Sequence, residues 1–89
     1  MSLIIQKYGG SSVADGDKIM NVARRIARTA ESGNQVVAVV SAMGDTTDDL
    51  IKLAYNVCDN PSSRELDVLL STGEIVSSTL LAMALQSLC

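Results

Sequence analysis

The chain has 89 residues, of which 47% are apolar and only 2% aromatic, and its formal charge is −3. This length allows one small domain or part of a larger one, with a core of aliphatic side chains. The acidic balance argues against a nucleic-acid surface, which would carry clustered basic residues. The one basic cluster, formed by Arg24, Arg25 and Arg28, is expected on the solvated face of a helix.

The chain contains two cysteines and no histidine. Cys58 and Cys89 lack the spacing of metal ligands, so we expect no zinc site and assign no residue to a metal. Cys58 is expected on a buried helix face, and the cysteine usage fits a reducing, cytoplasmic compartment. The N-terminus lacks the basic segment of a signal peptide. The apolar stretch 75–88 contains polar residues and is shorter than the ~20 residues that span a bilayer, so no membrane partner is expected.

The first predicted element is a strand at residues 2–8, whose apolar run is continuous, as in a parallel strand covered on both faces. It leads into Gly9 and Gly10 and then toward a helix start. Glycines let the backbone approach an anion, and a helix N-terminus favours negative charge. With Lys7 directly before the turn, the segment predicts a phosphate-binding loop. The alternative is a plain tight turn.

A helix is predicted from Asp15 to Ser32 and a second strand from Gln35 to Ser41. The helix carries one apolar stripe at helical spacing, formed by Ile19, Val22, Ala23, Ile26, Ala27 and Ala30. Asp15 suits its start and Gly33 its end. The β-branched run within the second strand also indicates burial on both faces. Strand, helix and strand in this order predict a parallel sheet in an α/β fold.

A further helix is predicted from Thr46 to about Cys58, with Thr46 as the cap of a capping box that includes Asp49. Its inward positions are expected to be Leu50, Ile51, Ala54, Val57 and Cys58. The segment Asp59 to Pro61 is expected to break this helix.

Ser62 and Glu65 form a second capping box, which starts the next helix. Gly73 is interpreted as a junction before a last helix, from Glu74 to Leu88. That last helix is apolar around most of its circumference, and two strands make a thin sheet. We therefore expect the chain to be the front portion of a longer protein.

Small polar residues and glycines follow both predicted strands, in residues 7–11 and 41–47. Ligands of parallel sheets bind beyond the carboxyl ends of the strands. The sequence therefore predicts a polar pocket between these two loops.

Three segments resemble the N-terminal signatures of aspartate kinases, in the amino acid kinase superfamily: Lys7–Val13, Val39–Asp48 and Leu70–Glu74. Their arrangement matches in order and spacing, and the resemblance extends over all 89 residues. Tyr8 replaces a more usual Phe and Ser12 a more usual Thr, and both keep the shape or the hydroxyl. The resemblance implies a partial three-layer α/β/α sandwich with parallel strands. Residues 1–89 would form the N-terminal part of the catalytic domain, with the nucleotide half and the regulatory domains elsewhere.

The resemblance also implies an activity, the ATP-dependent phosphorylation of the aspartate side-chain carboxylate, with Mg²⁺ accompanying ATP. This reaction would open lysine, threonine and methionine biosynthesis in a full-length protein that is a homo-oligomer, and the isolated 89 residues are expected to be inactive. A carboxylate with an ordinary pKa of ~3.9 needs no general base. Two alternatives stay open. One is a related kinase of glutamate, acetylglutamate, carbamate or UMP, and the other is a non-catalytic anion-binding or oligomerisation module.

By resemblance, Lys7 is catalytic and contacts the transferred phosphoryl group. The phosphate side of the site comprises Lys7, Tyr8, Gly9, Gly10 and Ser41. The aspartate side comprises Asp45, Thr46, Thr47, Asp48, Asp49 and Glu74. Thr47 would hold aspartate, and Glu74 would bind its α-ammonium, because a cation in a partly dry pocket needs an anionic partner. The plainer interpretations are a surface lysine at residue 7, a helix cap at Thr46, and solvated acids at the helix starts.

Overall fold

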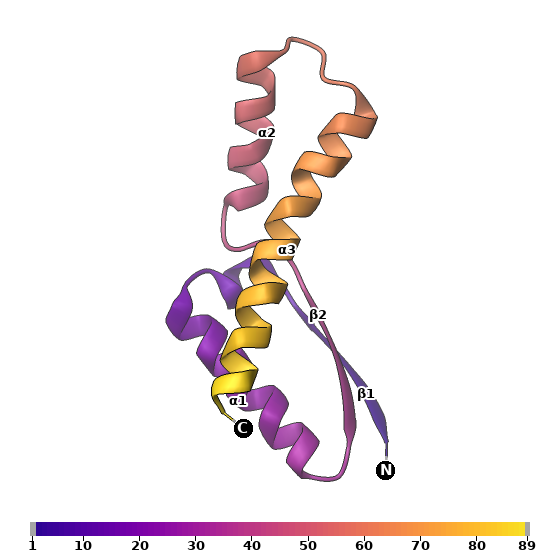
Figure 1. Ribbon diagram of the computed structural model, residues 1–89, viewed down its shortest axis with the longest axis vertical. Helices are drawn as coiled ribbons and strands as arrows, with labels where there is room; N and C mark the ends of the chain where they lie inside the picture. Colours follow the sequence, from indigo (N-terminus) through magenta and orange to yellow (C-terminus); the bar gives the residue numbers. More distant parts are fainter. Residues whose placement is uncertain (1, 89) are drawn as a thin grey trace.

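The computed structural model describes residues 2–88 and has the element order strand, helix, strand, helix, helix (Figure 1). Its elements are β1 (Leu3–Tyr8), the 3-10 turn η1 (Gly10–Val13), α1 (Gly16–Glu31), β2 (Gln35–Val40), α2 (Thr46–Val57) and α3 (Ser63–Ser87). β1 and β2 pair in parallel, with Leu3 opposite Gln35 and Tyr8 opposite Val40. The predicted parallel α/β arrangement is confirmed.

α1 forms as its sequence predicts. Its N-terminus is capped by Asp15, whose Oδ1 accepts a hydrogen bond of 2.9 Å from the Lys18 N–H. It ends at Glu31, and Gly33 then adopts a φ of +93°, a left-handed conformation that favours glycine. Four of the six predicted stripe positions are buried: Ile19, Val22, Ala23 and Ile26. They form one core with Leu81 and Ala84 of α3 and with Val36, Ala38 and Val40 of β2.

The two faces of the sheet differ. The side chains of Gln6, Tyr8 and the inward residues of β2 face α1 and α3. On the other face, the exposed fractions run from 47% to 65% for Leu3, Ile5, Val37 and Val39. The prediction that both strands are covered on both faces is therefore wrong for residues 2–88, because α1 and α3 pack on the same side.

α3 runs without a break through Gly73, so the predicted junction there is wrong. Gly73 is buried, and a Cβ atom at this position would lie 2.8 Å from Ala42 Cβ and 3.2 Å from Thr46 Cγ2. The glycine therefore lets the helix approach the loop between β2 and α2. The cost to the helix is the low helix propensity of glycine.

Because α3 is unbroken, it has 25 residues and is long and apolar enough to cross a bilayer by length and composition. The expectation that the apolar segment is too short to span a bilayer is therefore wrong, because the helix that contains it is longer than residues 75–88. The core helix of a water-soluble protein can also be this long and apolar, and α3 packs against α1, α2 and β2.

α2 and the first half of α3 project away from the sheet as a helical hairpin (Figure 1), in a molecule whose extents are 50 × 24 × 18 Å. Within α2 only Ala54 is buried. The predicted inward positions Val57 and Cys58 are exposed, because the helix ends at Val57 and the chain turns away there. The Ser62 cap of α3 is confirmed by a bond of 3.3 Å from the Glu65 N–H to Ser62 Oγ.

Candidate active site

The loops that follow β1 and β2 lie against each other at the carboxyl edge of the sheet. The Ser41 N–H donates to the Tyr8 carbonyl over 3.0 Å, and the Gly44 N–H donates to the Gly10 carbonyl over 2.9 Å. The parallel register places both strand ends at this edge, and the two hydrogen bonds then join the loops. The predicted juxtaposition of the two loops is present.

The contact between the loops depends on glycine. A Cβ atom on Gly10 would lie 2.9 Å from the Ala42 carbonyl oxygen and 3.0 Å from that of Gly44. Gly44 itself has a φ of +49°, in the left-handed region. Gly9 is different, since nothing lies within 4 Å of its Cβ position. Gly10 therefore serves the close approach of the two loops, whereas space is open beside Gly9.

The helix start expected after Gly9 and Gly10 is not that of α1. Residues Gly10–Val13 form a short 3-10 turn, and α1 begins only at Gly16. The Asp15 carboxylate already occupies the N-terminus of α1. The helix start that directly follows Gly9 is therefore that of the 3-10 turn, and the start of α1 carries its own acidic cap residue.

Lys7 lies on the exposed face of the sheet, opposite Val39. Tyr8 points the other way, into the core, where it is 8% exposed and its hydroxyl donates to Gln6 Oε1 over 2.7 Å. Tyr8 also lines two hollows near the end of β1.

A polar hollow of about 360 Å³ lies beside Lys7, with Ser12 and Arg25 among its lining residues. Arg25 and Ser12 also line an adjoining hollow of about 320 Å³, together with Lys18. The sequence pattern assigned Arg25 only to a solvated helix face. Arg25 is three residues after Val22 and therefore borders the buried stripe of α1. This spacing is the sequence signal that could have placed Arg25 beside the sheet.

The first turn of α2 carries the predicted aspartate-side residues. Asp45 occupies the N-cap position without a side-chain cap bond, and Thr46 is the first helical residue. The capping box with Thr46 as cap is therefore wrong, and the Thr46 N–H instead donates to the Met43 carbonyl over 2.9 Å. Thr46 is half-buried against Gly73, whereas the others are exposed: Asp45, Thr47, Asp48 and Asp49.

α3 also reaches this edge of the sheet. Glu74 is exposed and directly follows Gly73, which contacts Ala42 and Thr46. One turn later, the fully buried Ser77 donates from Oγ to the Ser41 carbonyl over 2.7 Å. Sequence reasoning missed Ser77, since a serine in an apolar helix gives no distinctive signal. The main chain thus brings the segments that carry Lys7, Ser41, Thr47 and Glu74 to one end of the sheet.

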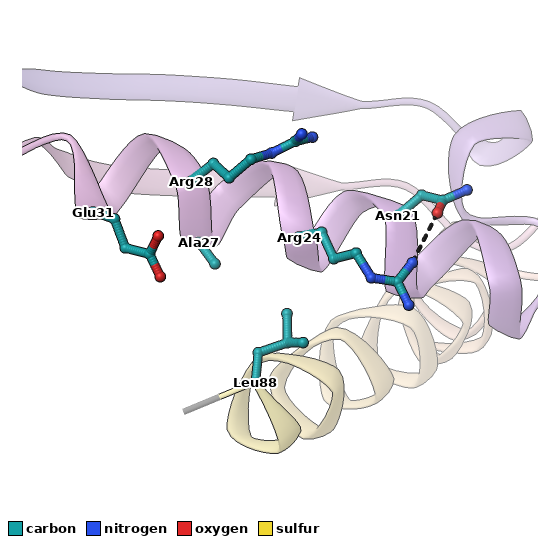
Figure 2. Close-up of a pocket in the computed structure, with 6 residues that line it drawn as sticks. All are labelled: Asn21, Arg24, Ala27, Arg28, Glu31 and Leu88. Carbon is teal, nitrogen blue, oxygen red and sulfur yellow. Dashed lines mark hydrogen bonds between the residues drawn. The ribbon is translucent and has the colours of Figure 1, made fainter.

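A larger hollow, of about 580 Å³, lies between α1 and the C-terminal end of α3 (Figure 2). It contains none of the predicted site residues and is lined by Asn21, Arg24, Ala27, Arg28, Glu31 and Leu88. Its polar side chains all come from α1, and the Arg24 guanidinium donates to Asn21 Oδ1 over 3.1 Å. Arg24 and Arg28 are exposed, as predicted for a solvated helix face. This hollow draws its polar side chains from one helix, whereas residues of several elements meet at the strand ends. The strand ends are therefore the better candidate for an active site.

Comparison with known proteins defines the class. The model of the amino acid kinase family matches residues 2–89, and the chain belongs to this family. It is 61% identical over 88 residues to the aspartokinase of Mycobacterium tuberculosis strain H37Rv, covering 99% of this chain and 21% of that protein. It is 55% identical over 86 residues to aspartokinase 2 of Bacillus subtilis, covering 97% of this chain and 21% of that protein.

A solved structure agrees with these relatives. The aspartate kinase from Synechocystis matches with a TM-score of 0.94 and 55% identity, over 97% of this chain and 15% of that chain. The fold prediction, an incomplete α/β arrangement of the aspartate kinase type, is confirmed. The chain spans about one fifth of the length of the curated relatives that it matches.

Proposed function

We propose that the protein containing this chain is a kinase that transfers the γ-phosphoryl group of ATP to the side-chain carboxylate of aspartate. The observation that carries the proposal is the direct contact between the two strand-end loops, through the Gly44 N–H and the Gly10 carbonyl. One loop follows Lys7 and the other leads to Thr47. The names of the relatives, aspartokinases at 54–61% identity, support the choice of substrate.

The reaction needs positioning and charge stabilisation. An oxygen of the aspartate carboxylate forms a bond to the γ-phosphorus as the bond to the bridging oxygen breaks, and ADP leaves. No proton is removed from the nucleophile, since the carboxylate is ionised at neutral pH. In this proposal the Lys7 ammonium contacts the transferred phosphoryl oxygens, with backbone N–H groups at Gly9 and Gly10 helping. Ser41, hydrogen-bonded to the end of β1, lines the same side.

The aspartate side of the site would be supplied by α2 and α3. In this proposal Thr47 holds aspartate with the help of the surrounding residues 45–49, and Glu74 binds the α-ammonium. The contact of Gly73 with Thr46 supports this pairing, because it brings the first turn of α2 beside the segment that carries Glu74. An anionic partner for the ammonium lowers the cost of taking that cation out of water.

Mg²⁺ would accompany ATP, where it neutralises charge on the phosphates. Residues 2–88 contain no group of three or more His, Cys, Asp or Glu side chains arranged to hold a metal ion. Mg²⁺ commonly takes one or two protein carboxylates and completes its shell with phosphate oxygens and waters. The described residues therefore fit a metal delivered with the nucleotide, and none of them is assigned to it.

The same proposal extends to the cellular role. The acyl phosphate would be the first intermediate toward lysine, threonine and methionine, made by a cytoplasmic homo-oligomer. The isolated 89 residues are expected to form no acyl phosphate, since they span about a fifth of the relatives' length.

The test is Lys7→Ala in the full-length protein, assayed by trapping the acyl phosphate as a hydroxamate. We expect kcat to fall by ~10²-fold or more, because a charge that acts on the transition state is lost. Lys52→Ala, at an exposed position on α2, is the matched control and should leave kcat unchanged. An unaltered kcat in Lys7→Ala would remove Lys7 from the mechanism.

Two further measurements separate the alternatives. A substrate panel with glutamate, acetylglutamate, carbamate and UMP distinguishes aspartate from the acceptors of related kinases. Isothermal titration of the full-length protein with aspartate and with ATP distinguishes an enzyme from a non-catalytic module. Binding of neither ligand would contradict the proposed function.

A further inference from the structure

Ser77 differs from the neighbouring hydroxyl residues of α3. It is 0% exposed, and its Oγ lies 2.7 Å from the Ser41 carbonyl oxygen, which belongs to a different element. The other hydroxyls with hydrogen bonds in the described part of α3 donate to carbonyls of their own helix: Ser71, Thr72, Ser78 and Ser87. Ser77 therefore links the helix to the β2–α2 loop, defined here as residues 41–45.

The direction of this hydrogen bond follows from its distances. Ser77 Oγ is also 3.2 Å from the Glu74 carbonyl oxygen, one turn back in α3. A hydroxyl has one hydrogen, and the shorter contact, 2.7 Å to Ser41, is the one with good O–H···O geometry. The shorter contact is therefore assigned as the main hydrogen bond, with Ser77 Oγ as donor and the Ser41 carbonyl as acceptor.

A second contact lies one helical turn away. Gly73 and Ser77 are four residues apart and therefore share a face of α3. Gly73 lies against Ala42 and Thr46, while Ser77 binds Ser41. The helix thus contacts the start of the β2–α2 loop and the residue that follows the loop, Thr46. The Gly44 N–H of the loop in turn donates to the Gly10 carbonyl.

We propose that Ser77 is a positioning residue for the phosphoryl transfer. It fixes the main chain of Ser41 and so orients the β2–α2 loop that carries the Ser41 hydroxyl and leads to Thr47. This inference rests on the proposed function for its consequence in catalysis, but the link itself is a property of the fold. Small displacements of groups that align two reactants are costly to rate, about 10²-fold for 1 Å.

The experiment compares Ser77→Ala with Ser78→Ala in the full-length protein. Ser78 is the matched control, because it is exposed and bonds only within its own turn. We expect Ser77→Ala to lower kcat/KM for aspartate by about tenfold or more. We also expect faster hydrogen exchange at the Gly44 and Thr46 amides, which are bonded to Gly10 and Met43. Ser78→Ala should change neither.

A conservative variant separates positioning from general stability. Ser77→Cys keeps nearly the same volume and a weak donor, so its kcat/KM should lie between those of wild type and Ser77→Ala. If Ser77→Ala does not fold, Ser77→Cys carries the test, and wild-type values for both kcat/KM and exchange would overturn the proposal. A lower melting temperature with unchanged kcat/KM and exchange would overturn it as well.

The two proposals fail in different ways. A full-length protein that folds but does not phosphorylate aspartate contradicts the proposed function. Faster exchange in Ser77→Ala would still support the link between α3 and the loop in that protein. Unchanged exchange in Ser77→Ala, with an active wild-type enzyme, overturns the positioning role alone.

Discussion

The two halves of α3 have very different surroundings. From Gly73 onward the helix buries one residue per turn, at Gly73, Ser77, Leu81 and Ala84, against α1, the sheet and the β2–α2 loop. Before Gly73 it lies against α2, and none of its residues is buried (Figure 1). The same helix is therefore a core element in its second half and one arm of an exposed hairpin in its first. The comparison indicates that the candidate site depends on the second half.

The largest expected effect comes from the core half. Leu81→Ala removes a side chain that is 5% exposed and should cost ~2–5 kcal/mol locally, through lost burial and a cavity. Leu80→Ala, one residue away and 38% exposed, should cost much less. Hydrogen exchange of the full-length protein measures this difference in α1 and α3. Equal effects of the two substitutions would contradict the assignment of Leu81 to the buried face of α3 and of Leu80 to the exposed face.

A smaller effect is expected at the boundary between the halves. Gly73→Ala places a methyl 2.8 Å from Ala42 Cβ, so the loop or the helix must shift. Overpacking costs ~1–3 kcal/mol, and the better helix propensity of alanine returns about 1 kcal/mol. The net result should be a modest loss of stability with faster exchange in residues 41–45. Gly16→Ala, where nothing lies within 4 Å of the new methyl, is the control and should not disturb that loop.

The smallest effect is expected in the exposed half. Ser62→Ala removes the oxygen that accepts the Glu65 N–H over 3.3 Å and should destabilise the start of α3 by ~1 kcal/mol. Exchange should accelerate in the hairpin, residues 46–70, but not at Leu81. Ser63→Ala, inside the helix and without a cap bond, is the comparison variant. Acceleration along the whole of α3 would mean that its halves unfold together.

The sequence predicted the parts of the fold that periodicity and cap residues determine. The stripe of Ile19, Val22 and Ile26 repeats at helical spacing and is buried, and the caps at Asp15 and Ser62 are where their side chains indicate. The juxtaposition of the strand-end loops followed from parallel pairing. All of these depend on residues close in sequence or on one topological rule.

The wrong predictions concern contacts between distant residues. Gly73 reads as a helix break, but its neighbour is Ala42, 31 positions away, and the small residue serves that contact. Thr46 is a residue type that often caps helices, yet it is the first helical residue of α2 and packs against Gly73. Val57 is apolar and at an inward position, but the helix ends there and leaves it 80% exposed. Tertiary contacts, which local patterns do not encode, decided the first two cases, and the position of the helix end decided the third.

An uninterrupted α3 has a mechanical consequence. At ~1.5 Å per residue it is a continuous helix about 38 Å long, packed in the core over its second half and against α2 alone over its first ten residues or so. A tilt of ~5° about Gly73 would swing the hairpin tip by about 1 Å, and the same tilt would press on or release Ala42. The projecting half of α3 is thus continuous with the segment that packs against the loop at the strand ends, through Gly73 and Ala42.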